Sequence, residues 1–131
     1  MTAGLRDALA WTTRSAPIET RLDVEGLRRY APEVEAAVYF CCLEAVQNAA
    51  KHAGITARAT IRVRETGADL VFDVSDNGSG FRPAEAAQSG GLTNMRDRAG
   101  AAGGTLEVTS APGAGTLVHG LVPTVSPPAA P

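Results

Sequence analysis

The sequence lacks the features that mark secreted, membrane and nucleic-acid-binding proteins. It contains no apolar run close to the roughly 20 residues that span a bilayer. Arg6, Asp7 and Arg14 interrupt the N-terminal stretch, where a signal peptide needs a continuous apolar segment. The formal net charge is -2, with acidic and basic residues interspersed, which gives no electrostatic reason to expect nucleic acid or a membrane as a direct partner. We therefore expect a cytoplasmic domain, with any membrane anchor of a longer parent outside this chain.

Cysteine is equally scarce. The two cysteines, Cys41 and Cys42, are adjacent within a predicted helix, where neighbouring side chains point in different directions. A structural disulfide or a metal site is therefore not expected. We predict two buried, reduced thiols.

What the sequence does contain is the pattern of one α+β domain. Its 131 residues, 44% of them hydrophobic, suffice to bury a single core. Periodicity predicts a helix end or helical turn at 4–14, helices at 33–53 and 92–102, and strands at 18–24, 57–64, 69–75, 105–110 and 116–123. The second and third strands are spaced as an antiparallel hairpin. We expect residues 1–16 to lead in from an upstream domain, residues 17–123 to form the domain, and residues 124–131 to be a disordered tail.

The long predicted helix carries a polar stripe. Glu44, Asn48 and His52 are spaced i, i+4 and i+8, so they share one face, with Lys51 beside them. The rest of this helix is almost entirely apolar, and burying a carboxylate and an amide without partners costs several kcal/mol. The stripe is therefore either the solvated face of the helix or a ligand site.

Two glycine-containing segments follow. Asp76 begins the sequence Asp-Asn-Gly-Ser-Gly-Phe directly after a strand, where an acid and two glycines form either a ligand loop or an ordinary turn. Gly90 and Gly91 precede Leu92 at the start of the next helix, where exposed backbone N–H groups favour phosphate. Capping of that helix by a polar residue in its first turn is the alternative.

A last glycine turn, Gly-Ala-Gly-Thr at 113–116, leads into the final strand, and a plain hairpin would explain it equally well. Each segment is a weak signal alone, but their order and spacing resemble the ATP-binding boxes of histidine kinases and of their Bergerat-fold ATPase relatives. LEAVQNAAKHAG is similar to the N box, VSDNGSGF to the first glycine box, and GGLTNMRDRAGAAGGTLEVTSAPGAGTLVHGLVP to the second glycine box and the closing strands. The resemblance covers about residues 33–123 and is strongest to the NarL/DesK-type sensor kinases.

The resemblance implies a fold and a set of phosphate-side residues. The fold is a two-layer α+β sandwich, a mixed and mostly antiparallel sheet of about five strands covered on one face by about three helices. Asn48 would be the Mg²⁺ ligand, since Mg²⁺ prefers oxygen donors. Glu44 would lie near the γ-phosphate and polarise an acceptor or a water. Lys51 and His52 would lie beside the phosphates.

The resemblance also implies how the base is held. Asp76 would accept a hydrogen bond from the adenine amino group, and Thr116 would support Asp76. Gly78 and Gly80 would let the backbone pass close to the base, with Phe81 ending the same box. The residues that would line the phosphate side are Gly90, Gly91 and Leu92. Ser89 stands where the family usually has the first glycine of the second box, which leaves the local lid geometry open.

The function implied is that of the ATP-binding catalytic domain of a two-component sensor histidine kinase. Such a domain uses ATP and Mg²⁺ and transfers the γ-phosphate to a histidine on a separate dimerisation domain, with a response regulator as a further partner. The two histidines here, His52 and His119, lie in the N box and in the final strand, so neither suits the acceptor role. The alternatives are a stand-alone anti-sigma factor serine kinase of the same fold and a non-catalytic ATP-binding module.

Overall fold

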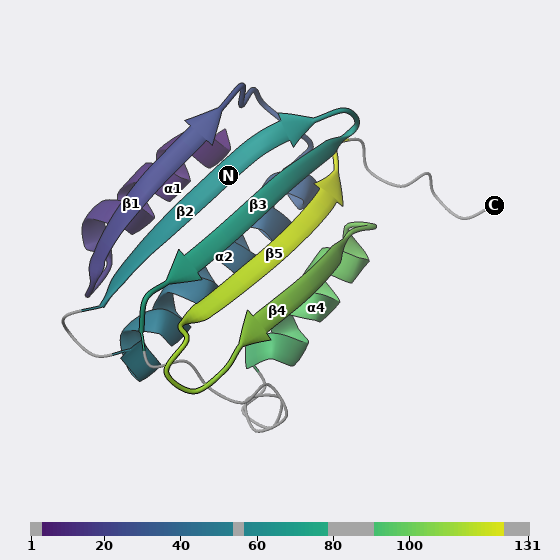
Figure 1. Ribbon diagram of the computed structural model, residues 1–131. Coiled ribbons are helices and arrows are strands. Elements are labelled where there is room, and N and C mark those ends of the chain that lie inside the picture. Colours follow the sequence, from purple (N-terminus) through teal and green to yellow (C-terminus); the bar gives the residue numbers. More distant parts are fainter. Residues whose placement is uncertain (1–3, 54–56, 79–90, 125–131) are drawn as a thin grey trace.

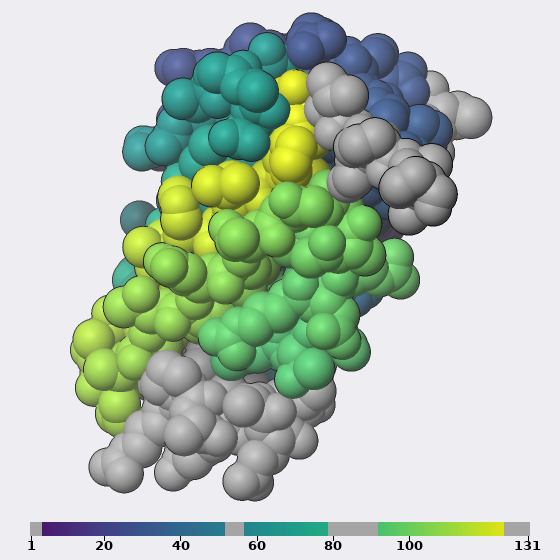
Figure 2. Space-filling model, turned by 90° about the vertical axis from the view of Figure 1, so that its right-hand side faces the viewer, coloured from purple at the N-terminus to yellow at the C-terminus, as the bar shows by residue number. Residues whose placement is uncertain are grey.

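The computed structural model describes residues 4–53, 57–78 and 91–124. Over these ranges the chain forms an open five-stranded sheet with three helices on one of its faces (Figure 1). The helices are α1 (Gly4–Ser15), α2 (Pro32–Ala53) and α4 (Gly91–Ala101). The strands are β1 (Glu19–Glu25), β2 (Arg58–Thr66), β3 (Asp69–Asp76), β4 (Thr105–Ser110) and β5 (Thr116–Pro123). The expected two-layer α+β sandwich is confirmed, and the layers of β4 and α4 adjoin in the side view (Figure 2).

The strand order explains why the sheet is mixed. Neighbouring strands follow the order β1-β2-β3-β5-β4. β1 and β2 are parallel, with α2 as the crossover that parallel strands require, whereas the other three pairs are antiparallel. β5, the last strand in the chain, therefore lies inside the sheet, between β3 and β4.

The core lies between the sheet and α2. α2 carries apolar side chains on nearly all sides. Five of them are at most 1% exposed: Val34, Val38, Cys41, Cys42 and Val46. Phe72 of β3 is the largest fully buried side chain opposite them. No helix in the described part of the chain combines the length and apolar character that crossing a bilayer requires.

α1 is a full helix of 12 residues, where the sequence predicts only a helix end or a turn. Leu5 and Leu9, at 1% and 0% exposure, belong to the same buried cluster as the core residues of α2. The hydroxyl of Thr12 donates to the carbonyl of Ala8 at 3.0 Å, which satisfies this buried polar group within the helix.

A buried carboxylate fixes the connection from β1 to α2. Glu35, in the first turn of α2, is only 1% exposed. It accepts hydrogen bonds from the backbone N–H of Tyr30 at 3.2 Å and from Nε of Arg29 at 3.3 Å. Burying a carboxylate is tolerated here because its charge is paired and hydrogen-bonded.

The uncovered face of the sheet carries a row of alternating acidic and basic side chains. Cross-strand register places Asp23, Arg62, Asp73, His119 and Glu107 side by side across all five strands. Asp23 lies 3.5 Å from Nε of Arg62, and Asp73 lies 2.5 Å from Nδ1 of His119. Opposite charges in facing positions favour the pairing of the strands that carry them.

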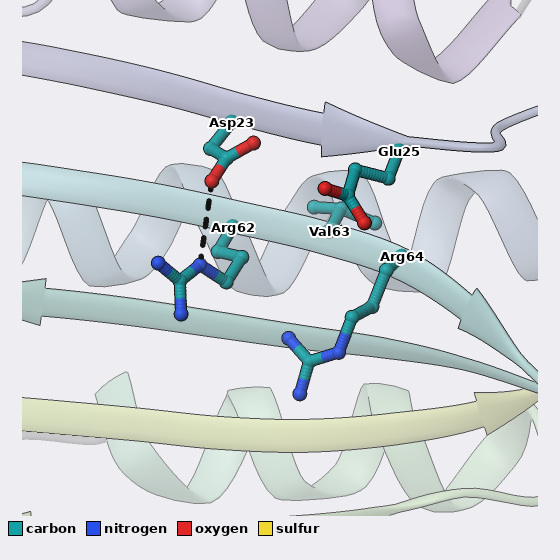
Figure 3. A pocket seen from close by; sticks show the side chains of 5 residues that line it. All are labelled: Asp23, Glu25, Arg62, Val63 and Arg64. Carbon is teal, nitrogen blue, oxygen red and sulfur yellow. Dashed lines mark ion pairs between the residues drawn. The ribbon is translucent and has the colours of Figure 1, made fainter.

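A hollow of about 200 Å³ lies beside this row (Figure 3). Its lining consists of Asp23, Glu25, Arg62, Val63 and Arg64. Arg64 extends away from Glu25 and contacts Asp73 at 3.4 Å. The arginines of this hollow are therefore engaged with carboxylates of the same face.

Candidate functional site

Four segments meet at one end of the sheet. The last turns of α2, the end of β3, the start of α4 and the turn between β4 and β5 lie at this end (Figure 1). α2 packs against α4, β3 and β5, which holds these segments together. The polar residues predicted for nucleotide binding are carried by these four segments.

The helix-facing side of the sheet changes from apolar to polar at this end. The last apolar row consists of Ile61, Val74, Val118 and Val108. In the next row along the same face, Asp76 of β3 is paired in register with Thr116 of β5, which is paired with Ser110 of β4. All three are half-buried. A row of acid and hydroxyl groups at the margin of an apolar core is suited to bind a flat, partly polar ligand.

The carboxylate of Asp76 is held from one side only. The backbone N–H of Gly78 donates to its Oδ1 at 2.8 Å. Asn77 extends the pairing of β3 with β2, because its Oδ1 accepts from the backbone N–H of Arg58 at 2.7 Å. Within the described ranges the other oxygen of Asp76, Oδ2, makes no hydrogen bond or ion pair, which leaves it free to accept one from a ligand.

A hydroxyl pair lies next to Asp76. Oγ of Ser110 and Oγ1 of Thr116 are 2.8 Å apart, and Oγ of Ser110 is also 3.0 Å from the carbonyl oxygen of Gly115. An open hollow of about 340 Å³ lies around the end of these strands and includes Asp76, Ser110 and Thr116 in its lining. The structure thus places Asp76 and Thr116 in register on neighbouring strands.

Glu44 and Asn48, in the polar stripe of α2, have no partners among the residues that the structure describes. Glu44 and Asn48 are half-buried one helical turn apart, and neither makes a hydrogen bond or ion pair with any described residue. Lys51 is exposed in the last turn of the same helix. His52 also lies in α2, but its side chain is outside the described part of the structure.

The start of α4 is anchored to α2. Leu92 and Met95 are 2% and 0% exposed, so Leu92 serves the core. Sγ of Cys41 lies 3.5 Å from the carbonyl oxygen of Met95, and the guanidinium of Arg98 lies 4.5 Å from the centre of the Phe40 ring. α4 begins at Gly91.

Both cysteines are free and buried, as predicted. Burial raises the pKa of the Cys41 thiol to about 12, although the nearby charge of Arg98 opposes this shift. Burial also raises the pKa of Cys42. Neither thiol is therefore a nucleophile near neutral pH.

Three predicted site residues, Gly80, Phe81 and Gly90, lie outside the described residues, as does Ser89. Sequence reasoning did not single out Ser110, which the structure places beside Thr116. The sequence pattern could have indicated this pair. Ser110 ends one predicted strand and Thr116 begins the next, so the turn 111–115 brings them opposite each other.

A second hollow, of about 540 Å³, lies on the uncovered face of the sheet. It is lined by Arg21, Asp23, Thr60, Arg62, Asp73, Ser75 and Leu117. Its charged groups include the ion pair of Asp23 with Arg62. It shares Ser75 and Leu117 with the hollow around Asp76, but Glu44, Asn48 and Asp76 do not line it.

Relatives of known class match most of the chain. The family model described as histidine kinase-, DNA gyrase B-, and HSP90-like ATPase matches residues 33–126. DegS of Bacillus subtilis, a signal transduction histidine-protein kinase/phosphatase, is 35% identical over 100 residues, which are 73% of this chain and 26% of DegS. The sensor protein VraS of Staphylococcus saprophyticus is 30% identical over 118 residues, which are 88% of this chain and 33% of VraS. The chain therefore spans about a quarter to a third of the length of these relatives.

Solved structures share the fold at low sequence identity. The mycobacterial sensor histidine kinase MprB superposes with a TM-score of 0.66 at 21% identity, covering 97% of both chains. The blue-light activated histidine kinase of Erythrobacter litoralis superposes with a TM-score of 0.76 at 19% identity, covering 92% of this chain and 40% of that one. These solved structures show the shared fold. The family match and the two curated relatives show that the chain belongs to the histidine kinase-, DNA gyrase B- and HSP90-like ATPases and is an ATP-binding catalytic domain of the histidine kinase type.

Proposed function

We propose that this chain binds Mg²⁺-ATP at the polar end of the sheet and transfers the γ-phosphate to a histidine on a dimerisation domain. One observation carries the proposal. The acceptor row of Asp76 and Thr116 lies at the same end of the fold as a carboxylate and an amide, Glu44 and Asn48, that have no protein partner among the described residues. Half-buried polar groups without partners are expected where a ligand supplies them.

Asp76 is the group that recognises the base. Its Oδ1 is engaged by the N–H of Gly78, and its Oδ2 can accept a hydrogen bond from the amino group of adenine. Thr116 is its neighbour in register and adds a second polar atom on the same side. A site built to hydrogen-bond a ligand group discriminates strongly against analogues that lack the group.

Asn48 is the protein group that fits a Mg²⁺ ion. Its amide oxygen is a hard donor that has no partner among the described residues, and one or two protein oxygens are typical where phosphates and water complete the shell. No group of three or more His, Cys, Asp or Glu side chains in the described ranges could hold a metal ion alone. When bound, Mg²⁺ would neutralise charge on the phosphates. Lys51 is placed to add positive charge beside them.

Glu44 is proposed to orient the acceptor and to take up its proton. It lies one turn before Asn48 on the same face of α2, so it is next to the phosphate side of the site. Phosphoryl transfer depends mainly on positioning and charge stabilisation, which a carboxylate on a rigid helix supplies. The acceptor histidine, the dimerisation domain that carries it and a response regulator are the partners we propose.

The anti-sigma factor serine kinase of the same fold is not favoured, because the curated relatives with 30% and 35% identity are named as a sensor protein and a histidine kinase. A non-catalytic ATP-binding module is also not favoured. The polar side chains that phosphoryl transfer needs, Glu44 and Asn48, are both present and unpaired within the described part of the chain.

Calorimetric titration with Mg²⁺-ATP tests the proposal. Asp76→Ala should weaken ATP binding by about tenfold or more, because hydrogen bonds to charged groups are the strong ones. Circular dichroism should stay unchanged, since the side chain of Asp76 is half-buried and its one hydrogen bond among the described residues is with the N–H of Gly78. Asp7→Ala, an exposed acidic residue of α1, is the matched control and should leave the affinity unchanged. Equal affinity of wild type and Asp76→Ala would contradict the assignment.

A further inference from the structure

We infer that Ser110 is a positioning residue that makes the site selective for a purine with an amino group at position 6. It does so by fixing the direction of the hydroxyl proton of Thr116. The inference rests on the proposed function, because it concerns the side of the site that would receive the base. Ser110 itself is not a proposed ligand contact.

Proton accounting at the hydroxyl pair gives the direction of each hydrogen bond. The carbonyl oxygen of Gly115 can only accept, so its contact with Oγ of Ser110 at 3.0 Å uses the single proton of the serine hydroxyl. The contact of 2.8 Å between Ser110 and Thr116 can then be a hydrogen bond only if Thr116 donates. The proton of Thr116 is thereby directed toward β4.

The result is that Thr116 presents lone pairs rather than a proton to its other neighbours. Strand order places Ser110 on the side of Thr116 opposite Asp76, because β5 lies between β4 and β3. Asp76 offers a carboxylate oxygen on that other side. Both polar groups facing the base are therefore hydrogen-bond acceptors.

Two acceptors match a donor and reject an acceptor. The amino group at position 6 of adenine has N–H donors, directly or through a bridging water, for both groups. A carbonyl at position 6, as in inosine or guanine, would bring a third acceptor against them. Selectivity of this kind comes from an unfavourable contact built against the wrong ligand. Without the serine hydroxyl, the hydroxyl of Thr116 could rotate and donate to such a carbonyl.

The experiment compares ATP with inosine triphosphate, which differs at position 6, in calorimetric titrations with Mg²⁺. Wild type should prefer ATP by about tenfold or more, since a single hydrogen-bond mismatch is of that order. Ser110→Ala should lower the ratio of the two affinities by about three- to tenfold. Ser110→Thr, which keeps the hydroxyl, should restore the ratio. Thr105→Ala, an exposed threonine on the opposite face of β4 and outside the lining of the hollow around Asp76, is the matched control and should leave it unchanged.

The outcomes separate this inference from the proposed function. If wild type binds no ATP, or Asp76→Ala binds it as well as wild type, the proposed function fails and the inference fails with it. If Asp76→Ala loses ATP but Ser110→Ala weakens both nucleotides equally or neither, the proposed function stands and this inference is overturned. It is also overturned if Thr105→Ala lowers the ratio as much as Ser110→Ala, because the effect would then come from a general change in β4.

Discussion

Gly115→Ala should destabilise the protein far more than Gly113→Ala, although both glycines have positive φ, +74° and +80°. A Cβ on Gly115 would lie 2.3 Å from the carbonyl oxygen of Asp76, whereas a Cβ on Gly113 would meet nothing within 4 Å. The left-handed backbone alone makes alanine unfavourable by about 1–2 kcal/mol, which is the expected loss for Gly113→Ala. At Gly115 the added Cβ must also push Asp76 of β3 away from the start of β5. This overpacking raises the expected loss in the free energy of unfolding to about 2–5 kcal/mol.

Urea unfolding followed by far-ultraviolet circular dichroism measures both losses, and an unchanged slope would show that the denatured states are comparable. The difference between the two variants isolates the close approach of Gly115 to Asp76, because the backbone penalty is common to both. Gly115→Ala should also weaken ATP binding, since it displaces Asp76 relative to Thr116. Equal free energies of unfolding for the two variants would refute the reasoning.

Three further predictions concern the thiols and the proposed transfer. Cys41 and Cys42 should resist a thiol reagent at pH 8 until urea unfolds the protein. Burial raises the pKa of Cys41 to about 12 and raises that of Cys42 as well. Rapid labelling of the native protein would contradict this prediction. The chain alone should not label itself on histidine with radioactive ATP. The proposed dimerisation domain with its acceptor histidine, added separately, should allow weak transfer, since tethering normally supplies about millimolar effective concentration. Glu44→Gln should slow that transfer while ATP binding persists, because the amide cannot take a proton. Strong acid-labile labelling of the chain alone would show that one of its own histidines accepts phosphate.

The strands of the C-terminal half could be predicted from the sequence because their signals are local. Alternation and the glycine turn 113–116 define β4 and β5, which begin and end at the predicted residues. β2 and β3 are longer than predicted because pairing extends them: β2 to Thr66, opposite Asp69, and β3 to Asp76, opposite Ala59 and Thr116. The strand order, with β5 inside the sheet, depends on contacts between distant segments that no local pattern encodes.

The parts that could not be predicted depend on what each side chain meets. An acidic residue in the first turn is common in helices, so the sequence does not show that Glu35 is buried. Its burial depends on hydrogen bonds from the N–H of Tyr30 and the side chain of Arg29. Leu5 and Leu9 alone give too short a pattern to distinguish a turn from the full α1, which the core of α2 stabilises. Ser110 is an ordinary strand residue until the register places it opposite Thr116.

The alternating row on the uncovered face has a consequence for the electric field outside the molecule. Neighbouring strands are about 4.8 Å apart, so Asp23, Arg62, Asp73, His119 and Glu107 place unlike groups closer together than the screening length of about 8 Å in physiological salt. Fields from such closely spaced opposite charges largely cancel within a few ångströms of the surface. A macromolecule approaching this face would meet little attraction or repulsion at long range. Replacing Arg62 alone would remove the cationic partner of Asp23 and make this part of the surface more negative, while Asp73 would keep Arg64 and His119 as neighbours.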